Sequence, residues 1–156
     1  LILMILVNKK NKQLLNINIK ELVLINEMSM TIGLVMLTIG NFLGGMWANE
    51  SWGRYWGWDP KETWALISIM VYAFVIHMRL IPGLKSNFAF TVASILSFGS
   101  IIMTYFGVNF YLAGLHSYAK DDQEISFVFI GITLVMVLLL SLLAYPKYKK
   151  YLKNNR

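Results

Sequence analysis

The sequence predicts an all-α integral membrane protein with about four transmembrane helices and a tryptophan-rich external loop. Of its 156 residues, 57% are hydrophobic and only 14% are charged. Several stretches without charge are long enough to cross a hydrocarbon core of about 30 Å. All five tryptophans fall in one connection between two of these stretches, residues 47–64. We therefore expect a helical bundle whose most distinctive surface is that connection.

Uncharged runs mark the four expected helices. They are 28–49, 63–78, 86–119 and 125–146. The second run is short, but residues 60–81 rise about 33 Å as a helix and span if their charged ends lie in the interfaces. The third run is too long for one crossing and is expected to include an extended outer loop.

The chain divides by composition into three parts. Residues 1–27 are interpreted as the broken end of an earlier helix followed by a cytoplasmic linker, so the chain is expected to be a fragment of something larger. A signal peptide fits this start less well, because the charges follow the apolar run. Residues 28–119 form the expected main membrane domain, and 120–156 add a further helix with a basic cytoplasmic tail.

The distribution of charge predicts the orientation. Eleven of the fourteen Lys and Arg residues lie on one side of the four-helix arrangement, which is the cytoplasm by the positive-inside rule. Six of the eight acidic residues lie on the other side, so the tryptophan loop is expected to face the periplasm or an equivalent compartment. The basic tail fits anionic lipid head groups, and nucleic acid is not expected as a partner.

Asp59, Pro60, Lys61 and Glu62 have the form of a helix start. The pattern is an Asp N-cap, Pro at the first helical position and Glu at the third, as in a capping box. The Asp59 carboxylate is therefore expected to accept backbone N–H groups of that turn. A role facing a ligand would be additional.

The tryptophans allow two interpretations. Each could belong to an interfacial aromatic belt, but five on one short connection exceed what anchoring requires. Gly53 and Gly57 would let a planar ligand approach the backbone while neighbouring indoles supply stacking surface. Arg54 and Lys61 could neutralise carboxylates at the edge of such a ligand.

The two histidines both lie in apolar stretches. His77 is about 25 Å along its helix, near the cytoplasmic end, where an ionisable group is either functional or lies at the head groups. His116 follows the third helix on the outer side, as a surface-loop residue or a metal ligand. A lone histidine cannot form a zinc site but can be an axial ligand of haem iron. Haem is flat, apolar on both faces and carboxylated at one edge, so it suits the loop and His116 together.

The segment WGRYWGWDPKETWAL resembles the tryptophan-rich WWD signature of CcsA-type (ResC-type) cytochrome c biogenesis proteins, the system II cytochrome c synthases. The similarity covers roughly residues 21–119. In that family the motif is an external haem-binding surface, and Arg54 and Gly57 fill its variable positions. The resemblance assigns haem binding to Trp52, Gly53, Tyr55, Trp56, Trp58, Asp59, Pro60, Lys61, Glu62 and Trp64.

The resemblance also implies two haem-iron ligands. His77 matches a histidine that binds haem within the membrane, and His116 matches an external axial ligand. A second external histidine is expected upstream of the motif, yet no histidine precedes His77. This chain therefore carries only part of the family's ligand set. The last helix resembles the extended end of versions in which two subunits are fused.

The implied activity is cytochrome c maturation with haem b as ligand and substrate. Haem would be presented to the Cys-x-x-Cys-His motif of an apocytochrome c, beside a membrane partner of the CcsB (ResB) type, separate or fused. The protein's task is positioning, and no catalytic residue is predicted in a chain without cysteine. Two alternatives are a transporter or channel subunit with an aromatic belt and no haem, and a structural subunit that docks a partner through the loop.

Overall fold

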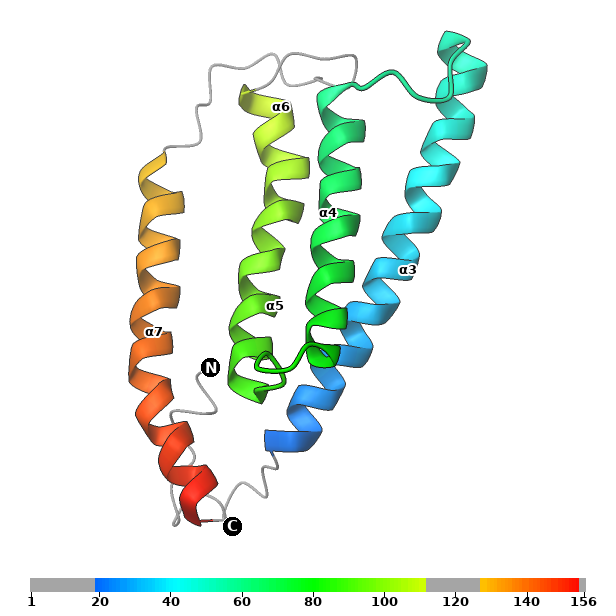
Figure 1. Ribbon diagram of the computed structural model, residues 1–156. Helices are drawn as coiled ribbons and strands as arrows, with labels where there is room; N and C mark the ends of the chain where they lie inside the picture. The colour runs from blue at the N-terminus through cyan, green and yellow to red at the C-terminus, as the bar shows by residue number, and fades with distance from the viewer. Residues whose placement is uncertain (1–18, 112–126, 155–156) are drawn as a thin grey trace.

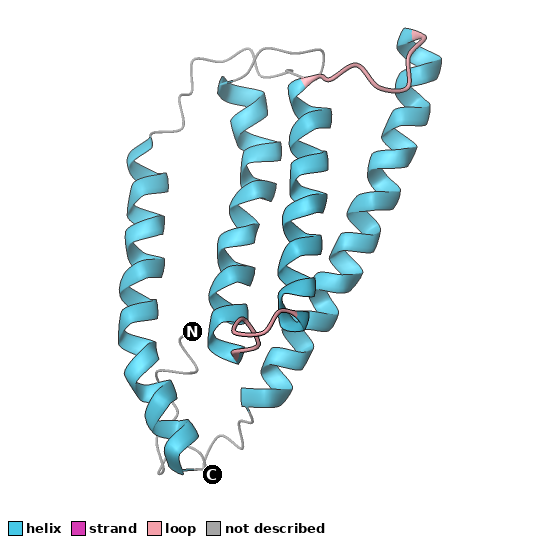
Figure 2. Cartoon of the chain, viewed as in Figure 1, coloured by secondary structure: helices cyan, strands magenta, loops and turns pink. Residues whose placement is uncertain are grey.

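The computed structural model describes residues 19–111 and 127–154, and the chain is helical throughout these ranges except in the connections 53–59 and 81–86. Four stretches are long and apolar enough to cross a membrane, which confirms the predicted all-α membrane fold. No strand occurs within the described ranges (Figure 2). The four stretches are Ile19–Trp52, Pro60–Leu80, Asn87–Phe110 and Gly131–Lys150.

The helices stand side by side in the order α3, α4, α5 and α7 (Figure 1). Helix α3 (Ile19–Trp52) and helix α5 (Asn87–Ile102) both pack against α4 (Pro60–His77) and also contact each other, and α7 (Phe127–Asn154) lies beyond α5. The connection 53–59 joins α3 to α4 at one end of the bundle, and the connection 81–86 joins α4 to α5 at the other (Figure 1). The two connections are therefore separated by the length of α4.

The tightest packing lies at the end that carries the connection 81–86. The buried cluster draws side chains from all four long helices: Ile19, Val23, Met30, Val75, Met78, Phe90, Ala144 and Tyr148. Phe88 contributes ring contacts to Tyr145 and Tyr148 on α7, with centroids 5.4 and 5.8 Å away. Helix α7 is therefore held to α5 mainly by aromatic packing at this end.

Helix α3 begins at Ile19, earlier than the sequence analysis expected, so residues 19–27 are helical instead of a linker. The polar residues that suggested a break are paired within the bundle. Asn26 donates to the Ser94 hydroxyl at 2.8 Å, and Glu27 lies 3.1 Å from the Arg79 guanidinium. Because the polar groups of Asn26 and Glu27 have partners elsewhere in the bundle, these residues are accommodated within α3 and the helix continues through them.

The third and fourth spans also differ in detail from the expected boundaries. After α5 the chain forms a π-helical turn (Met103–Gly107) and then the short helix α6 (Val108–Tyr111). Helix α7 continues through Pro146 to Asn154, so most of the expected basic tail is helical. The α4 span extends through the 3-10 turn η1 (Met78–Leu80), close to the predicted 60–81.

Candidate functional site

The tryptophan-rich connection leaves the last turn of α3 and enters the first turn of α4. Its indoles form two edge-to-face pairs. Trp47 and Trp52 have ring centroids 5.0 Å apart at 78°, and Trp56 and Trp58 have centroids 5.8 Å apart at 90°. This geometry is favourable for aromatic rings, so it stabilises one pair within the end of α3 and the other within the connection 53–59.

The start of α4 has the predicted capping box. Asp59 is the N-cap, Pro60 occupies the first turn, and the Asp59 carboxylate accepts the Lys61 backbone N–H at 3.2 Å. In return, the Asp59 backbone N–H donates to Oε2 of Glu62 at 3.3 Å. Asp59 is only 7% exposed. The expected capping role of Asp59 is confirmed, and its burial matches a carboxylate engaged by backbone donors.

Glu62 has a second bond that the capping box does not require. Its Oε2 also accepts the Gly57 backbone N–H at 2.8 Å, so one carboxylate holds the backbone on both sides of Trp58. Trp58 has φ 57°, a left-handed conformation that is uncommon for a bulky residue and costs about 1–2 kcal/mol. Its side chain is 72% exposed. The two Glu62 bonds thus stabilise a strained turn that directs one indole outward.

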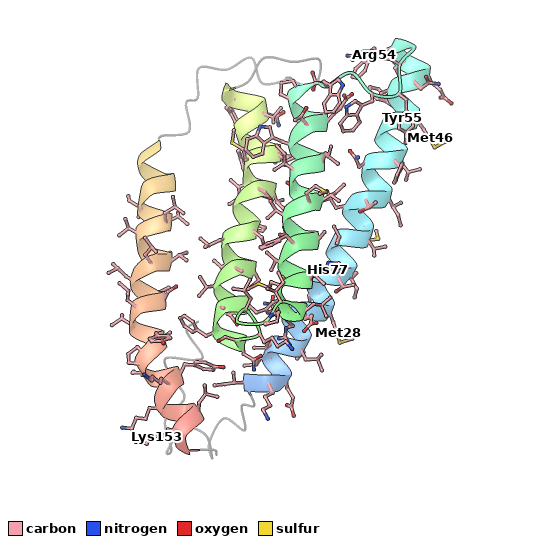
Figure 3. All side chains as sticks on the ribbon, in the orientation of Figure 1. Met28, Met46, Arg54, Tyr55, His77 and Lys153 are labelled. Atoms are coloured by element: carbon pink, nitrogen blue, oxygen red, sulfur yellow. The ribbon has the colours of Figure 1, made fainter. Side chains whose placement is uncertain are left out.

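Tyr55 fixes the other half of the connection to α3. Its hydroxyl donates to the Phe42 carbonyl at 3.1 Å, and its ring lies so close to Gly45 that a Cβ there would be 2.7 Å from the ring. Gly53 has φ 69° and donates to the Asn49 carbonyl at 2.9 Å, which lets the chain leave the helix and turn back. Figure 3 shows Tyr55 and Arg54 together at this end of the bundle.

Trp64 links the site to the third span through its backbone. The Thr104 hydroxyl in the π-helical turn lies 3.1 Å from the Trp64 carbonyl and 3.0 Å from the Ser68 hydroxyl. It also lies 2.8 Å from the Ser100 carbonyl, so its single proton is shared among competing acceptors. A π-helical turn in a spanning helix is unusual and frequently occurs at functional sites. Here it places Thr104 against the first turns of α4.

His77 ends α4, at the opposite end from the tryptophan connection (Figure 3). Its Nδ1 lies 2.7 Å from the Ala73 carbonyl. A carbonyl oxygen can only accept, so Nδ1 carries the proton and donates. In the neutral ring the lone pair is then on Nε2, which is the form that binds a metal ion. The His77 side chain is exposed in the described structure.

The structure brings together some of the predicted site residues and separates others. Gly57, Trp58, Asp59 and Glu62 form one hydrogen-bonded unit, whereas His77 is a helix length away. His116 lies outside the described residues. Within those residues, no group of three or more His, Cys, Asp or Glu side chains is placed to hold a metal ion.

Sequence reasoning missed three contacts that shape the site. They are the bond from Gly57 to Glu62, the packing of Tyr55 on Gly45, and the link from Thr104 to Trp64. The paired glycines Gly44 and Gly45 in a spanning helix were a signal for close approach by another group. Nothing local in the sequence predicted the other two contacts.

Comparisons with known proteins agree with these features. The model of the family described as cytochrome C assembly protein matches residues 1–116. Protein NrfI of Wolinella succinogenes is 53% identical over 137 residues, covering 88% of this chain and 15% of the relative. The cytochrome c biogenesis protein CcsA of Cuscuta reflexa is 49% identical over 102 residues, covering 65% of this chain and 33% of the relative.

A third relative is the cytochrome c biogenesis protein CcsA of Cyanophora paradoxa, which is 51% identical over 88 residues, 56% of this chain and 27% of the relative. The chain thus spans between 15% and 33% of the length of these curated relatives. The family match extends over most of the chain, including the tryptophan connection and the first three described spans. The chain therefore belongs to the cytochrome c assembly protein family.

Proposed function

We propose that this chain is the haem-handling portion of a cytochrome c biogenesis protein. Its tryptophan connection binds haem b at the external membrane surface and presents it to an apocytochrome c. The observation that carries this proposal is Trp58, an indole that is 72% exposed on a strained backbone turn that two hydrogen bonds to Glu62 hold in place. The family membership of the chain supplies the biological context.

The strained turn favours a ligand surface over a simple membrane belt. A belt residue needs only an amphipathic ring near the interface, which any helix end provides without backbone strain. Strain of this kind persists only where surrounding bonds impose it, and it gathers at functional sites. The exposed Trp58 and the partly buried Trp56 offer apolar faces to a flat ligand. Haem fits this surface because its own faces are flat and apolar.

The two histidines support two haem positions instead of one. An α4 helix of 18 residues separates His77 from the tryptophan connection by roughly 25 Å, which is too far for one haem to reach both. His77 would bind haem within the membrane, through Nε2, on its way to the external surface. His116 would then be the axial ligand of haem at the tryptophan connection. Haem is the cargo in this scheme, and it crosses from one position to the other.

The charge distribution supports this direction of transfer. Arg79 and Lys85 lie at or beside the connection 81–86, and Lys147 is on α7 between Ala144 and Tyr148 of the buried cluster at the same end, which the positive-inside rule favours as cytoplasmic. The connection 53–59 lies at the opposite end and would therefore be external. His77 would meet haem on the cytoplasmic side, and the indoles would hold it on the side where apocytochromes are matured.

The reaction proposed at the external surface is the addition of a thiol to a vinyl group. It depends more on the relative orientation of the two groups than on a residue that activates either of them. Each Cys thiol of the substrate adds across a haem vinyl group: a C–S bond forms, and the thiol hydrogen passes to the other vinyl carbon. No oxidant is consumed, and the chain supplies no thiol because it has no cysteine. When both vinyl groups are held within reach of the Cys-x-x-Cys-His motif, the reaction no longer depends on a chance collision between haem and apocytochrome in the correct orientation. A CcsB-type membrane partner would complete the site.

The test is the visible absorption spectrum of the full-length protein purified in detergent with its partner from haem-replete cells. We expect a Soret band in the wild type, a shifted or weaker band in His116→Ala, and a separate change in His77→Ala. Gln123→Ala, in the same outer segment as His116, is the matched control and should leave the spectrum unchanged. A colourless wild-type protein would contradict the proposal and favour the transporter or the structural alternative.

A further inference from the structure

Arg54 and Gly57 form a close contact inside the tryptophan connection. The Arg54 guanidinium lies against the Gly57 backbone, with Nη1 in the space that a Cβ at position 57 would occupy. Arg54 is partly buried there. Any side chain at position 57 would therefore displace the guanidinium. Glycine at position 57 permits this close approach. Its backbone is not in the left-handed conformation that favours glycine, so backbone conformation is not the reason for a glycine here.

Within the described residues, the Arg54 guanidinium has no acidic partner. The acidic residues nearest to it along the chain are Glu50, Asp59 and Glu62, and the last two direct their carboxylates to backbone N–H groups. Among residues 19–111 and 127–154, Arg54 forms no hydrogen bond and no ion pair. The Arg54 nitrogens are not among the buried side-chain atoms that lack a partner, so their donors are accessible to an anion that approaches the connection. The position of Arg54 thus fits a binding group for an external carboxylate.

Lys61 is the other cation in the connection, and it is placed differently. It lies in the first turn of α4, where its backbone N–H is engaged by Asp59. Its ammonium is a point charge on a flexible stem, whereas a guanidinium presents a planar fork that matches both oxygens of a carboxylate. Arg54 is also positioned by the backbone of the residue between Trp56 and Trp58. Of the two cations, Arg54 is the one whose charged group lies against the backbone of the connection.

We propose that Arg54, positioned on Gly57, binds a carboxylate at the edge of a flat ligand that stacks on one indole of the perpendicular Trp56–Trp58 pair. This inference rests on the proposed function, in which the ligand is haem and the carboxylate is a propionate. Gly57 is then a positioning residue, because the absence of a side chain lets the guanidinium lie against its backbone. The ligand class is a planar aromatic molecule with an ionised carboxylate at one edge.

The experiment compares two probes on the full-length protein with its partner: ferric haem b and its dimethyl ester, in which both propionates are blocked. Binding is measured by titration of the Soret band and of tryptophan fluorescence in detergent. The wild type should bind haem about tenfold more tightly than the ester, the size of one charge-assisted hydrogen bond at a partly exposed position. Arg54→Ala should lose this preference, and Arg54→Lys should keep only part of it.

Gly57→Ala tests the position of the guanidinium without removing its charge. It should also lose the preference for haem over the ester, and the double variant Arg54→Ala/Gly57→Ala should lose no more than either single variant. Gly44→Ala is the matched control, because a Cβ at Gly44 meets no other atom within 4 Å. Lys85→Ala, in the connection 81–86 at the other end of α4, controls for a general loss of positive charge and should keep the preference.

The possible results separate this inference from the proposed function. A wild type that binds neither probe contradicts haem binding itself. A wild type that binds both probes equally overturns the role of Arg54 while leaving haem binding intact. The inference also fails if Lys85→Ala abolishes the preference, or if Arg54→Ala weakens haem and the ester to the same extent.

Discussion

The two ends of α4 are ordered by different means. At the end with the connection 53–59, these seven residues are held by short-range bonds to Asp59 and Glu62, whose carboxylates accept backbone N–H groups at most five positions away. At the other end, side chains from all four long helices meet in the buried cluster around Phe90. The connection 53–59 is thus ordered locally, by bonds that do not depend on the packing of the bundle. Its bonds can be changed without removing the packing that holds the helices together.

The largest effect on stability is expected at the packed end. Phe90 has no exposed surface, and the Arg79 guanidinium lies 4.6 Å from its ring centroid. Phe90→Ala leaves a cavity and should lower the free energy of unfolding by about 3 kcal/mol. Unfolding of the full-length protein in detergent, followed by circular dichroism, measures the loss. Phe98→Ala on the same helix, at a ring that is 55% exposed, should cost far less. Equal losses would show that the cluster does not dominate stability.

The next largest effect is expected from substitutions of Glu62, which should change the order of the connection 53–59 more than the stability of the bundle. Glu62→Ala removes both bonds that flank Trp58, while Glu62→Gln keeps an acceptor oxygen without the charge. We expect Glu62→Ala to destabilise the start of α4 by about 1 kcal/mol, the usual cost of losing a cap. Amide hydrogen exchange of 53–59 should rise in this variant, while exchange of 81–86 stays unchanged. Faster exchange in both connections would mean that the two ends are not independent.

The ion pair at the packed end should contribute less than the buried cluster around it. Glu27 and Arg79 lie 3.1 Å apart, with 28% and 29% of their side chains exposed. Surface pairs contribute up to about 1 kcal/mol, so Glu27→Gln should lower stability by about that amount. The loss should shrink as salt is raised, because added ions screen the pair in the wild type. A loss that does not depend on salt would point to packing of the Glu27 stem instead.

The sequence predicted the elements whose causes are local. The uncharged runs located the spans, and the Asp-Pro-Lys-Glu pattern located the start of α4 because a capping box involves only neighbouring residues. The early start of α3 could not be predicted, since the polar side chains of Asn26 and Glu27 are compensated by residues on other helices. The exposed position of the Trp58 side chain was missed for a related reason. It requires Glu62 to accept the backbone N–H of Gly57 as well as that of the N-cap residue Asp59. The position of the Arg54 guanidinium could not be predicted either, because it depends on the path of the backbone at Gly57.

The smallest effect tests whether the strain at Trp58 serves ligand binding. Trp58→Gly removes a side chain from a left-handed residue, which relieves up to about 1 kcal/mol of strain because glycine adopts this conformation freely. The side chain is 72% exposed, so the packing lost in exchange is chiefly its edge-to-face contact with Trp56. The two effects are of similar size, so we expect Trp58→Gly to be about as stable as the wild type, while its haem absorbance falls. Trp47→Gly is the matched control, since Trp47 is 52% exposed but lies within α3, where glycine weakens the helix. If Trp58→Gly kept full haem absorbance, the outward indole would be a membrane anchor, and the backbone strain would need another explanation.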